Sequence, residues 1–123
     1  MTIDSEGSHI FLDYTNYVLD NSGDAILDLL QRAAAKGGAR EVHAHVEIFD
    51  GTFSPTGFAA VVLIDESHIT AHCYYEKGLL AIDIFTCGGT DPDIIADIIH
   101  SELMVDIPIL KLMRRNKVER FIH

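Results

Sequence analysis

Basic residues are scarce in this chain: nine Lys and Arg stand against nineteen Asp and Glu, which leaves a net charge of -10. A protein that follows phosphate backbones needs clustered positive charge, so this balance argues against nucleic acid and anionic membranes as partners. Most of the basic residues gather near the C-terminus, where a run of this kind predicts a solvated strand face. These residues are Lys111, Arg114, Arg115, Lys117 and Arg120.

Long apolar runs and cysteines are scarce as well. No stretch reaches the roughly 18 apolar residues that a membrane-spanning helix requires. The first residues, MTIDSEGSH, are acidic where an export signal needs a basic start and an apolar segment. Without such a signal the two cysteines, Cys73 and Cys87, are expected to be free thiols. We therefore expect a cytoplasmic protein, and its length suits a single domain over residues 1–123.

Two segments have the apolar spacing of amphipathic helices. Ser22 can cap the start of the first helix, and the glycine pair at 37–38 ends it. The second helix opens at Asp91, with Pro92 in its first position. The predicted buried stripes are Ile26, Leu29, Leu30, Ala33 and Ala34 in the first helix, and Ile94, Ile95, Ile98, Ile99 and Leu103 in the second.

Six segments are predicted to be strands, and no internal repeat is visible. Apolar and polar residues alternate from 40 to 49, the period of a half-buried strand with one dry face. Short connections between the later strands favour antiparallel pairing. The predicted strands are residues 9–14, 40–49, 58–64, 68–74, 79–85 and 107–113. With one helix before the second strand and one before the last, this order predicts an α+β fold, a two-layer sandwich of an antiparallel sheet with two helices on one face.

The candidate chemistry lies in the stretch from Asp65 to Cys73, DESHITAHC, and in FTCGG at 85–89. An acid precedes Ser67 and His72 follows five residues later. The G-x-S-x-G elbow of a hydrolase nucleophile is missing, so a Ser-His-Asp triad is excluded. Taken alone, a Ser-His pair on a strand is typical of a polar strand face.

Zinc is an alternative interpretation of the histidines and cysteines. His43 and His45 lie on one predicted strand face, and alternate strand residues can bind the same metal. His68, His72 and Cys87 are the further candidate ligands. No C-x-x-C or H-E-x-x-H spacing is present, however, so we predict no metal site.

The DESHITAHC stretch, its setting and the later cysteine resemble the bacterial and archaeal S-adenosylmethionine decarboxylases. The apolar run before ESH, the histidine after Ser67 and TCGG after an apolar strand follow the family's order. The resemblance implies that the chain cuts itself between Glu66 and Ser67 into residues 1–66 and 67–123. Ser67 then becomes a pyruvoyl group, the cofactor, whose ketone forms a Schiff base with the substrate amine and takes up the electrons freed as CO₂ leaves.

The resemblance also implies a role for each residue of the site. The family's processing histidine falls on His72 and its proton-donating cysteine on Cys87, and both side-chain types can exchange protons near neutral pH. The aromatic that stacks on adenine falls on Phe53, and the acid that binds the ribose hydroxyls falls on Glu76. The implied substrate is S-adenosylmethionine, decarboxylated for spermidine synthesis, and the implied assembly is a homodimer with its sites at the subunit interface.

The chain departs from the family at the cleavage site. The family has a serine that helps the carbonyl at the cleavage site accept attack, and Ala59 stands in its place. Loss of such a hydroxyl predicts slower self-cleavage, unless Thr70, His68 or water replaces it.

The chain also departs from the family around the substrate. Residues 50–52 replace the basic residue and histidine that usually precede Phe53, and the family's Thr-Trp-Pro-Glu reads Cys-Tyr-Tyr-Glu at 73–76. A remodelled pocket leaves ornithine or arginine as alternative substrates. A non-catalytic, unprocessed relative that serves as a binding or partner subunit is the alternative function.

Overall fold

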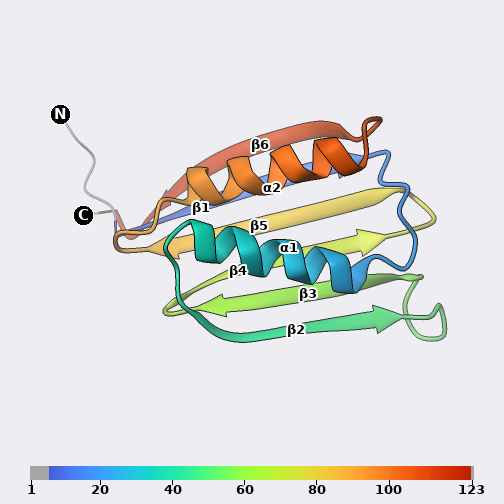
Figure 1. Ribbon diagram of the computed structural model, residues 1–123, viewed down its shortest axis with the longest axis horizontal. Coiled ribbons are helices and arrows are strands. Elements are labelled where there is room, and N and C mark those ends of the chain that lie inside the picture. The colour runs from blue at the N-terminus through green and yellow to red at the C-terminus, as the bar shows by residue number, and fades with distance from the viewer. Residues whose placement is uncertain (1–5, 123) are drawn as a thin grey trace.

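The computed structural model describes residues 6–122, which form one sheet with two helices packed on it (Figure 1). The elements are β1 (Gly7–Thr15), α1 (Gly23–Lys36), β2 (Glu41–Phe49), β3 (Gly57–Ile64), β4 (Ser67–Tyr74), β5 (Leu79–Cys87), α2 (Pro92–Asp106) and β6 (Lys111–Arg120). The strand order is β2-β3-β4-β5-β1-β6, and every neighbouring pair is antiparallel. The predicted α+β class and element order are confirmed.

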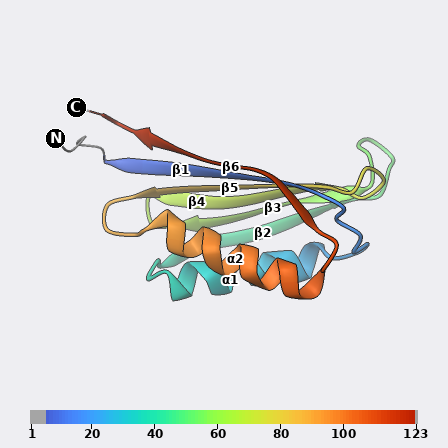
Figure 2. The same cartoon turned by 90° about the horizontal axis from the view of Figure 1, so that it is seen from above.

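Both helices cover the same face of the sheet, and in residues 6–122 no helix covers the other face (Figure 2). Successive strand residues point to opposite faces, so every second side chain lies away from the helices. We call this side the uncovered face. It includes His9, Phe11 and Asp13 of β1, His43, His45 and Glu47 of β2, Ala59, Val61 and Leu63 of β3, His68, Thr70, His72 and Tyr74 of β4, Leu79, Ala81, Asp83 and Phe85 of β5, and Arg114, Asn116 and Val118 of β6.

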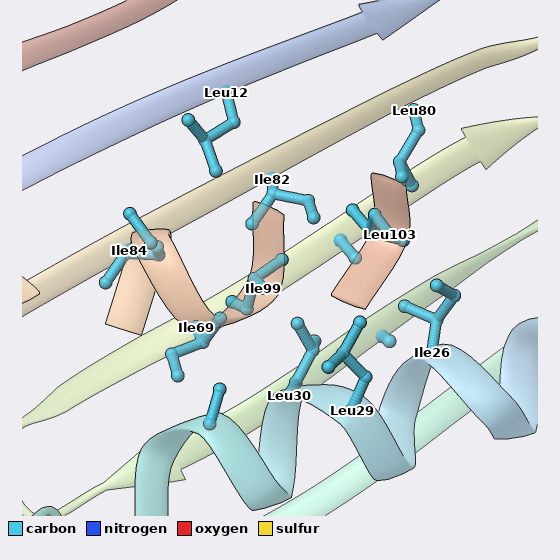
Figure 3. Close-up of a cluster of buried hydrophobic side chains, with 14 of the residues drawn as sticks. Leu12, Ile26, Leu29, Leu30, Ile69, Leu80, Ile82, Ile84, Ile99 and Leu103 are labelled. Carbon is cyan, nitrogen blue, oxygen red and sulfur yellow. The ribbon is translucent and has the colours of Figure 1, made fainter. Parts of the chain in front are cut away.

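The core lies between the helices and the other face of the sheet. Figure 3 shows Ile26, Leu29 and Leu30 of α1 and Ile99 and Leu103 of α2 together with Ile69, Leu80, Ile82 and Ile84 of the central strands. All five residues of the predicted stripe of α1 are buried. In α2 the prediction was wrong for Ile94, which is 49% exposed, because it lies on the flank of the helix rather than toward the sheet. Neither helix of the described chain is long and apolar enough to cross a membrane.

The two helices begin differently. Asp91 caps α2 as predicted, since its Oδ1 accepts the backbone N–H of Asp93 at 2.9 Å. Ser22 precedes α1, but its side chain does not cap the helix. Its Oγ instead contacts the hydroxyl of Tyr17 and donates to the carbonyl of Leu19. The sequence pattern located the start of α1 but not the partner of the Ser22 hydroxyl.

The last strand begins later than predicted. Residues 107–110 form a turn, in which Leu110 N–H donates to the carbonyl of Ile107, and β6 covers Lys111–Arg120. Pro108 has no N–H to offer a sheet, which keeps this segment out of the strand. The edge strand β2 also differs: Val42 and Ile48 of its predicted dry face are 55% and 52% exposed, because an edge strand has a neighbour on one side only.

The basic run of β6 is partly ion-paired rather than only solvated. Arg115 contacts Asp93 and Asp97 of α2 at 3.0 and 2.7 Å, and Lys117 contacts Asp93 at 2.8 Å. These bonds hold the pKa of the Asp93 carboxyl below its ordinary value, with Lys117 as the largest cause. The face of β6 toward α2 is therefore charged, so this strand lacks the alternation of apolar and polar residues by which a strand is predicted from sequence.

Candidate active site

Ser67 begins β4 directly after a two-residue turn. Ile64 pairs with Ser67, so Asp65 and Glu66 form the whole connection between β3 and β4. Asp65 has a φ of 50°, a left-handed conformation that Asp tolerates better than most residues. Its carboxylate accepts the Arg40 guanidinium at 2.9 Å, and its N–H donates to the Arg40 carbonyl at 3.1 Å. The turn therefore holds the Glu66–Ser67 peptide bond at the end of the sheet.

Ser67 and Cys87 meet at this end of the sheet. The backbone N–H of Cys87 donates to Ser67 Oγ at 3.0 Å, and Ser67 is 9% exposed. Both residues line a pocket of about 330 Å³ together with Glu66 and the loop at 88–90. A second pocket, on the side of Phe121, shares Glu66 and Cys87 with the first. Three of the predicted site residues thus lie together, and we call their position the serine end.

His72 lies at the other end of β4 and on the other side of the sheet. It follows Ser67 by five residues, which corresponds to about 16 Å along an extended strand. Its side chain is exposed on the uncovered face, opposite Ala59 of β3 and Ala81 of β5. It also lines a pocket with Ser54 and Pro55. Within one chain, the structure does not bring His72 to Ser67.

Phe53 and Glu76 lie at the same end as His72, which we call the histidine end. Phe53 is fully exposed in the loop at 50–56 between β2 and β3, and Glu76 lies in the turn after β4. Glu76 lines a pocket of about 500 Å³ with Tyr75, Thr56 and Asp50. In Figure 1 these two connections lie together at one end of the sheet, and the turn between β3 and β4 lies at the opposite end.

No histidine of the described chain lines the pocket at Ser67. His68 follows Ser67 in sequence, but its ring lies on the uncovered face, with its centroid 5.6 Å from that of Phe85 and 6.2 Å from that of His9. Burial lowers the pKa of His68, nearby His9 lowers it further, and Asp83 opposes both. Thr70 lies on the same face, so neither suggested replacement for the family serine reaches Ser67 of its own chain.

The zinc interpretation gains no support from the structure. Within residues 6–122 no group of three or more His, Cys, Asp or Glu side chains is arranged to hold a metal ion. His43 and His45 lie on the edge strand β2, where His45 Nε2 contacts Glu47 at 2.9 Å. Cys87 lies at the serine end, away from them.

Two residues to which the sequence analysis assigned no role support the site. Arg40 holds the turn before Ser67, and Tyr75 contacts the loop that carries Phe53. Their roles could not be read from a motif, because their partners are 25 and 19 residues away in sequence. Only the pairing of the strands could reveal them.

The family model that matches this chain is described as S-adenosylmethionine decarboxylase and covers residues 8–116. The chain belongs to the S-adenosylmethionine decarboxylase family. The resemblance that the motifs indicated is thereby confirmed, and with it the assignment to a family of carboxy-lyases.

Relatives of this decarboxylase family match most of the chain. The S-adenosylmethionine decarboxylase proenzyme of Bacillus velezensis is 37% identical over 108 residues, which cover 85% of this chain and 81% of the relative. The proenzyme of Geobacillus kaustophilus is 38% identical over 107 residues, with coverage of 82% and 80%. The crystal structure of the adenosylmethionine decarboxylase from Aquifex aeolicus superposes with a TM-score of 0.68 at 28% identity, and covers 98% of this chain and 94% of that one.

Proposed function

We propose that this chain is a self-processing S-adenosylmethionine decarboxylase, which cuts its Glu66–Ser67 bond and uses the pyruvoyl group made from Ser67. Family membership supports the reaction, and the names of the relatives as proenzymes support the self-cleavage. The observation that carries the proposal is the contact between Ser67 Oγ and the N–H of Cys87, in a pocket that both share with Glu66.

Self-cleavage starts with attack of Ser67 Oγ on the carbonyl carbon of Glu66. A C–O bond forms and the C–N bond breaks, so the peptide becomes an ester and the nitrogen of Ser67 becomes an amine. The N–H of Cys87 holds Oγ in place. A base then removes the α-proton of residue 67, and the Glu66 carboxylate leaves from Cβ. The remaining dehydroalanine takes up water and releases ammonia, which leaves a ketone at the new N-terminus.

The serine end fits the pyruvoyl group, because Ser67 opens into a pocket that also contains a thiol. When present, this group supplies a ketone that binds the substrate amine and accepts the electrons freed as CO₂ leaves. Cys87 lines the same pocket and can donate the proton of its Sγ to the carbon that has lost CO₂. The Arg40–Asp65 contact keeps the adjacent turn in position.

The complete site requires a second copy of the chain. Glu66, Ser67 and Cys87 lie at one end of the sheet, and His72 lies at the other end on the uncovered face. A twofold axis that lies in the interface and runs across the strands sets the serine end of each copy against the histidine end of the other, with Glu66 and Cys87 reached from the pocket beside Phe121, which gives two equivalent sites. His72 of the partner subunit would then be the processing base at Ser67.

The uncovered face exposes large apolar side chains, which a dimer interface could cover. Leu63, Leu79 and Val118 are 40%, 37% and 45% exposed on it, although they are large and apolar. Contact with a second copy would remove these side chains from water, which would stabilise the dimer.

The histidine end supplies groups that suit an adenosyl substrate. The exposed ring of Phe53 is free to stack on a purine, and an aromatic face also attracts the sulfonium. Glu76 can accept hydrogen bonds from two ribose hydroxyls. These contacts favour S-adenosylmethionine over ornithine or arginine, which lack both the base and the ribose.

Two measurements test this proposal on the purified protein. Intact mass should reveal fragments of residues 1–66 and 67–123, with a ketone in place of the amine of residue 67, and Ser67→Ala should stay one chain. The processed protein should then release CO₂ from S-adenosylmethionine. An uncut chain without turnover would support the non-catalytic partner subunit, and release from ornithine or arginine alone would overturn the substrate.

A further inference from the structure

Tyr75 connects three loops at the histidine end. Its backbone N–H donates to the carbonyl of Thr56 at 3.0 Å, which ties it to the loop at 50–56. Its hydroxyl accepts the backbone N–H of Ser22 at 3.1 Å, which ties it to the loop before α1. Its carbonyl accepts the N–H of Gly78 at 3.1 Å and closes the turn after β4.

Tyr75 is half-buried, and the residue that its hydroxyl contacts lies in the interior. Ser22 is 8% exposed, and its Oγ contacts the hydroxyl of Tyr17, which is 2% exposed. The N–H of Tyr17 donates to the carbonyl of Gly78 at 3.0 Å, so the same loop is bound to the turn a second time. The ring of Tyr75 packs against that of Phe58 with centroids 6.0 Å apart. Tyr75 itself is half-buried, so its bond to Ser22 is partly shielded from water, which strengthens it.

The hydrogen bonds of Tyr75 position the two residues that are proposed to bind the substrate. Glu76 follows Tyr75 directly, and the loop held through Thr56 carries Phe53. Both groups that the proposed function assigns to the adenosyl part are therefore placed through one residue. Phe53 itself is fully exposed, so its own side chain contributes nothing to fixing the loop.

We propose that Tyr75 is the positioning residue of the adenosine-binding end, and that it sets the distance between the Phe53 loop and Glu76. This inference rests on the proposed function for the identity of the substrate. Removal of the Tyr75 hydroxyl leaves the N–H of Ser22 buried without a partner, so the loop before α1 and the ring of Tyr75 move apart. Substrate binding should suffer, whereas self-cleavage should not, because the processing base His72 lies within strand β4 and not in these loops.

The test compares Tyr75→Phe with Tyr14→Phe in the processed enzyme. Tyr14 is a matched control because it is also a tyrosine with one hydroxyl contact, to His100 Nδ1 at 2.9 Å on α2. Tyr75→Phe should raise KM for S-adenosylmethionine about fivefold and change kcat less than about twofold, the size expected from one lost hydrogen bond. Tyr14→Phe should leave KM unchanged, and both variants should self-cleave as fast as the parent. An unchanged KM in Tyr75→Phe, or an equal rise in both variants, would overturn the inference.

A second measurement separates this inference from the proposed function. Amide hydrogen exchange in the uncut Ser67→Ala chain reports on the loops without any turnover. Adding Tyr75→Phe should speed exchange at residues 16–22 and 50–56 about fivefold or more, and adding Tyr14→Phe should not. Unchanged exchange in these loops would show that Tyr75 does not position them, even if the parent enzyme decarboxylates S-adenosylmethionine. Faster exchange in a protein without that activity would instead refute the proposed substrate and leave the role of Tyr75 in ordering the loops intact.

Discussion

Ala59 of β3 lies directly opposite His72 of β4, and both side chains point away from the helices. The resemblance to the family implies a serine at the position of Ala59, so the missing hydroxyl would lie beside the proposed processing histidine. A serine here would add a hydrogen-bond donor next to an imidazole, at the histidine end that faces Ser67 of the partner subunit in the proposed dimer.

We expect Ala59→Ser to speed self-cleavage by about tenfold or more, since one well-placed donor to a developing oxyanion is worth at least that much. The rate is read from the fraction of cut chain over time by intact mass. The gain should disappear in the double variant with His72→Ala. A cleavage rate equal to that of the parent would show that the hydroxyl has no role in this chain.

Mixing two inactive variants tests whether His72 acts across the dimer. Ser67→Ala and His72→Ala should each remain uncut alone, because one lacks the nucleophile and the other the base. Unfolded together in equal amounts and refolded, about half of the His72→Ala chains should be cut, since random pairing puts half of the chains in mixed twofold dimers. Size-exclusion chromatography checks the dimer, and a mixture that stays uncut would argue against a shared site.

The two cysteines should differ in reactivity. Cys73 is 2% exposed, and burial raises the pKa of its thiol to about 12, with a further contribution from Asp20. Cys87 is partly exposed and lines the pocket at Ser67. Iodoacetamide at pH 8 should therefore add one group to the native protein, at Cys87, and two after unfolding, as peptide mass mapping will reveal. Equal labelling of Cys73 in the native protein would contradict its burial.

Acid should weaken the fold through His68. Its pKa is lowered in the folded protein from an ordinary value of 6.5, by burial first and then by His9. The unfolded chain therefore takes up a proton that the folded chain resists, so the free energy of unfolding falls as the pH drops below 6.5 and stops falling below the lowered folded pKa. Urea unfolding between pH 7.5 and 5 should reveal a smaller loss for His68→Asn than for the parent. Identical losses would mean that His68 is not linked to folding.

Much of the fold could be predicted because its signals are local. The stripe from Ile26 to Ala34 and the alternation along β4 each follow from the repeat of one element, and they specify which side faces the core. The prediction was wrong where a partner outside the element decides. The late start of β6 depends on the turn at Pro108, and the polar character of its face toward α2 depends on the acids of that helix.

The sequence by itself determined the family, the element order and the Glu66–Ser67 motif, because these depend on residue types in a row. Only the tertiary structure decided which of the motif residues meet. Ser67 and Cys87 are 20 residues apart, yet antiparallel pairing of β4 with β5 brings them into hydrogen-bond contact. Ser67 and His72 are five residues apart, yet they lie on opposite faces at opposite ends of β4. Side chains an odd number of residues apart on a strand point to opposite faces, and each residue adds about 3.3 Å of length. Two groups five residues apart on one strand therefore cannot meet within one chain.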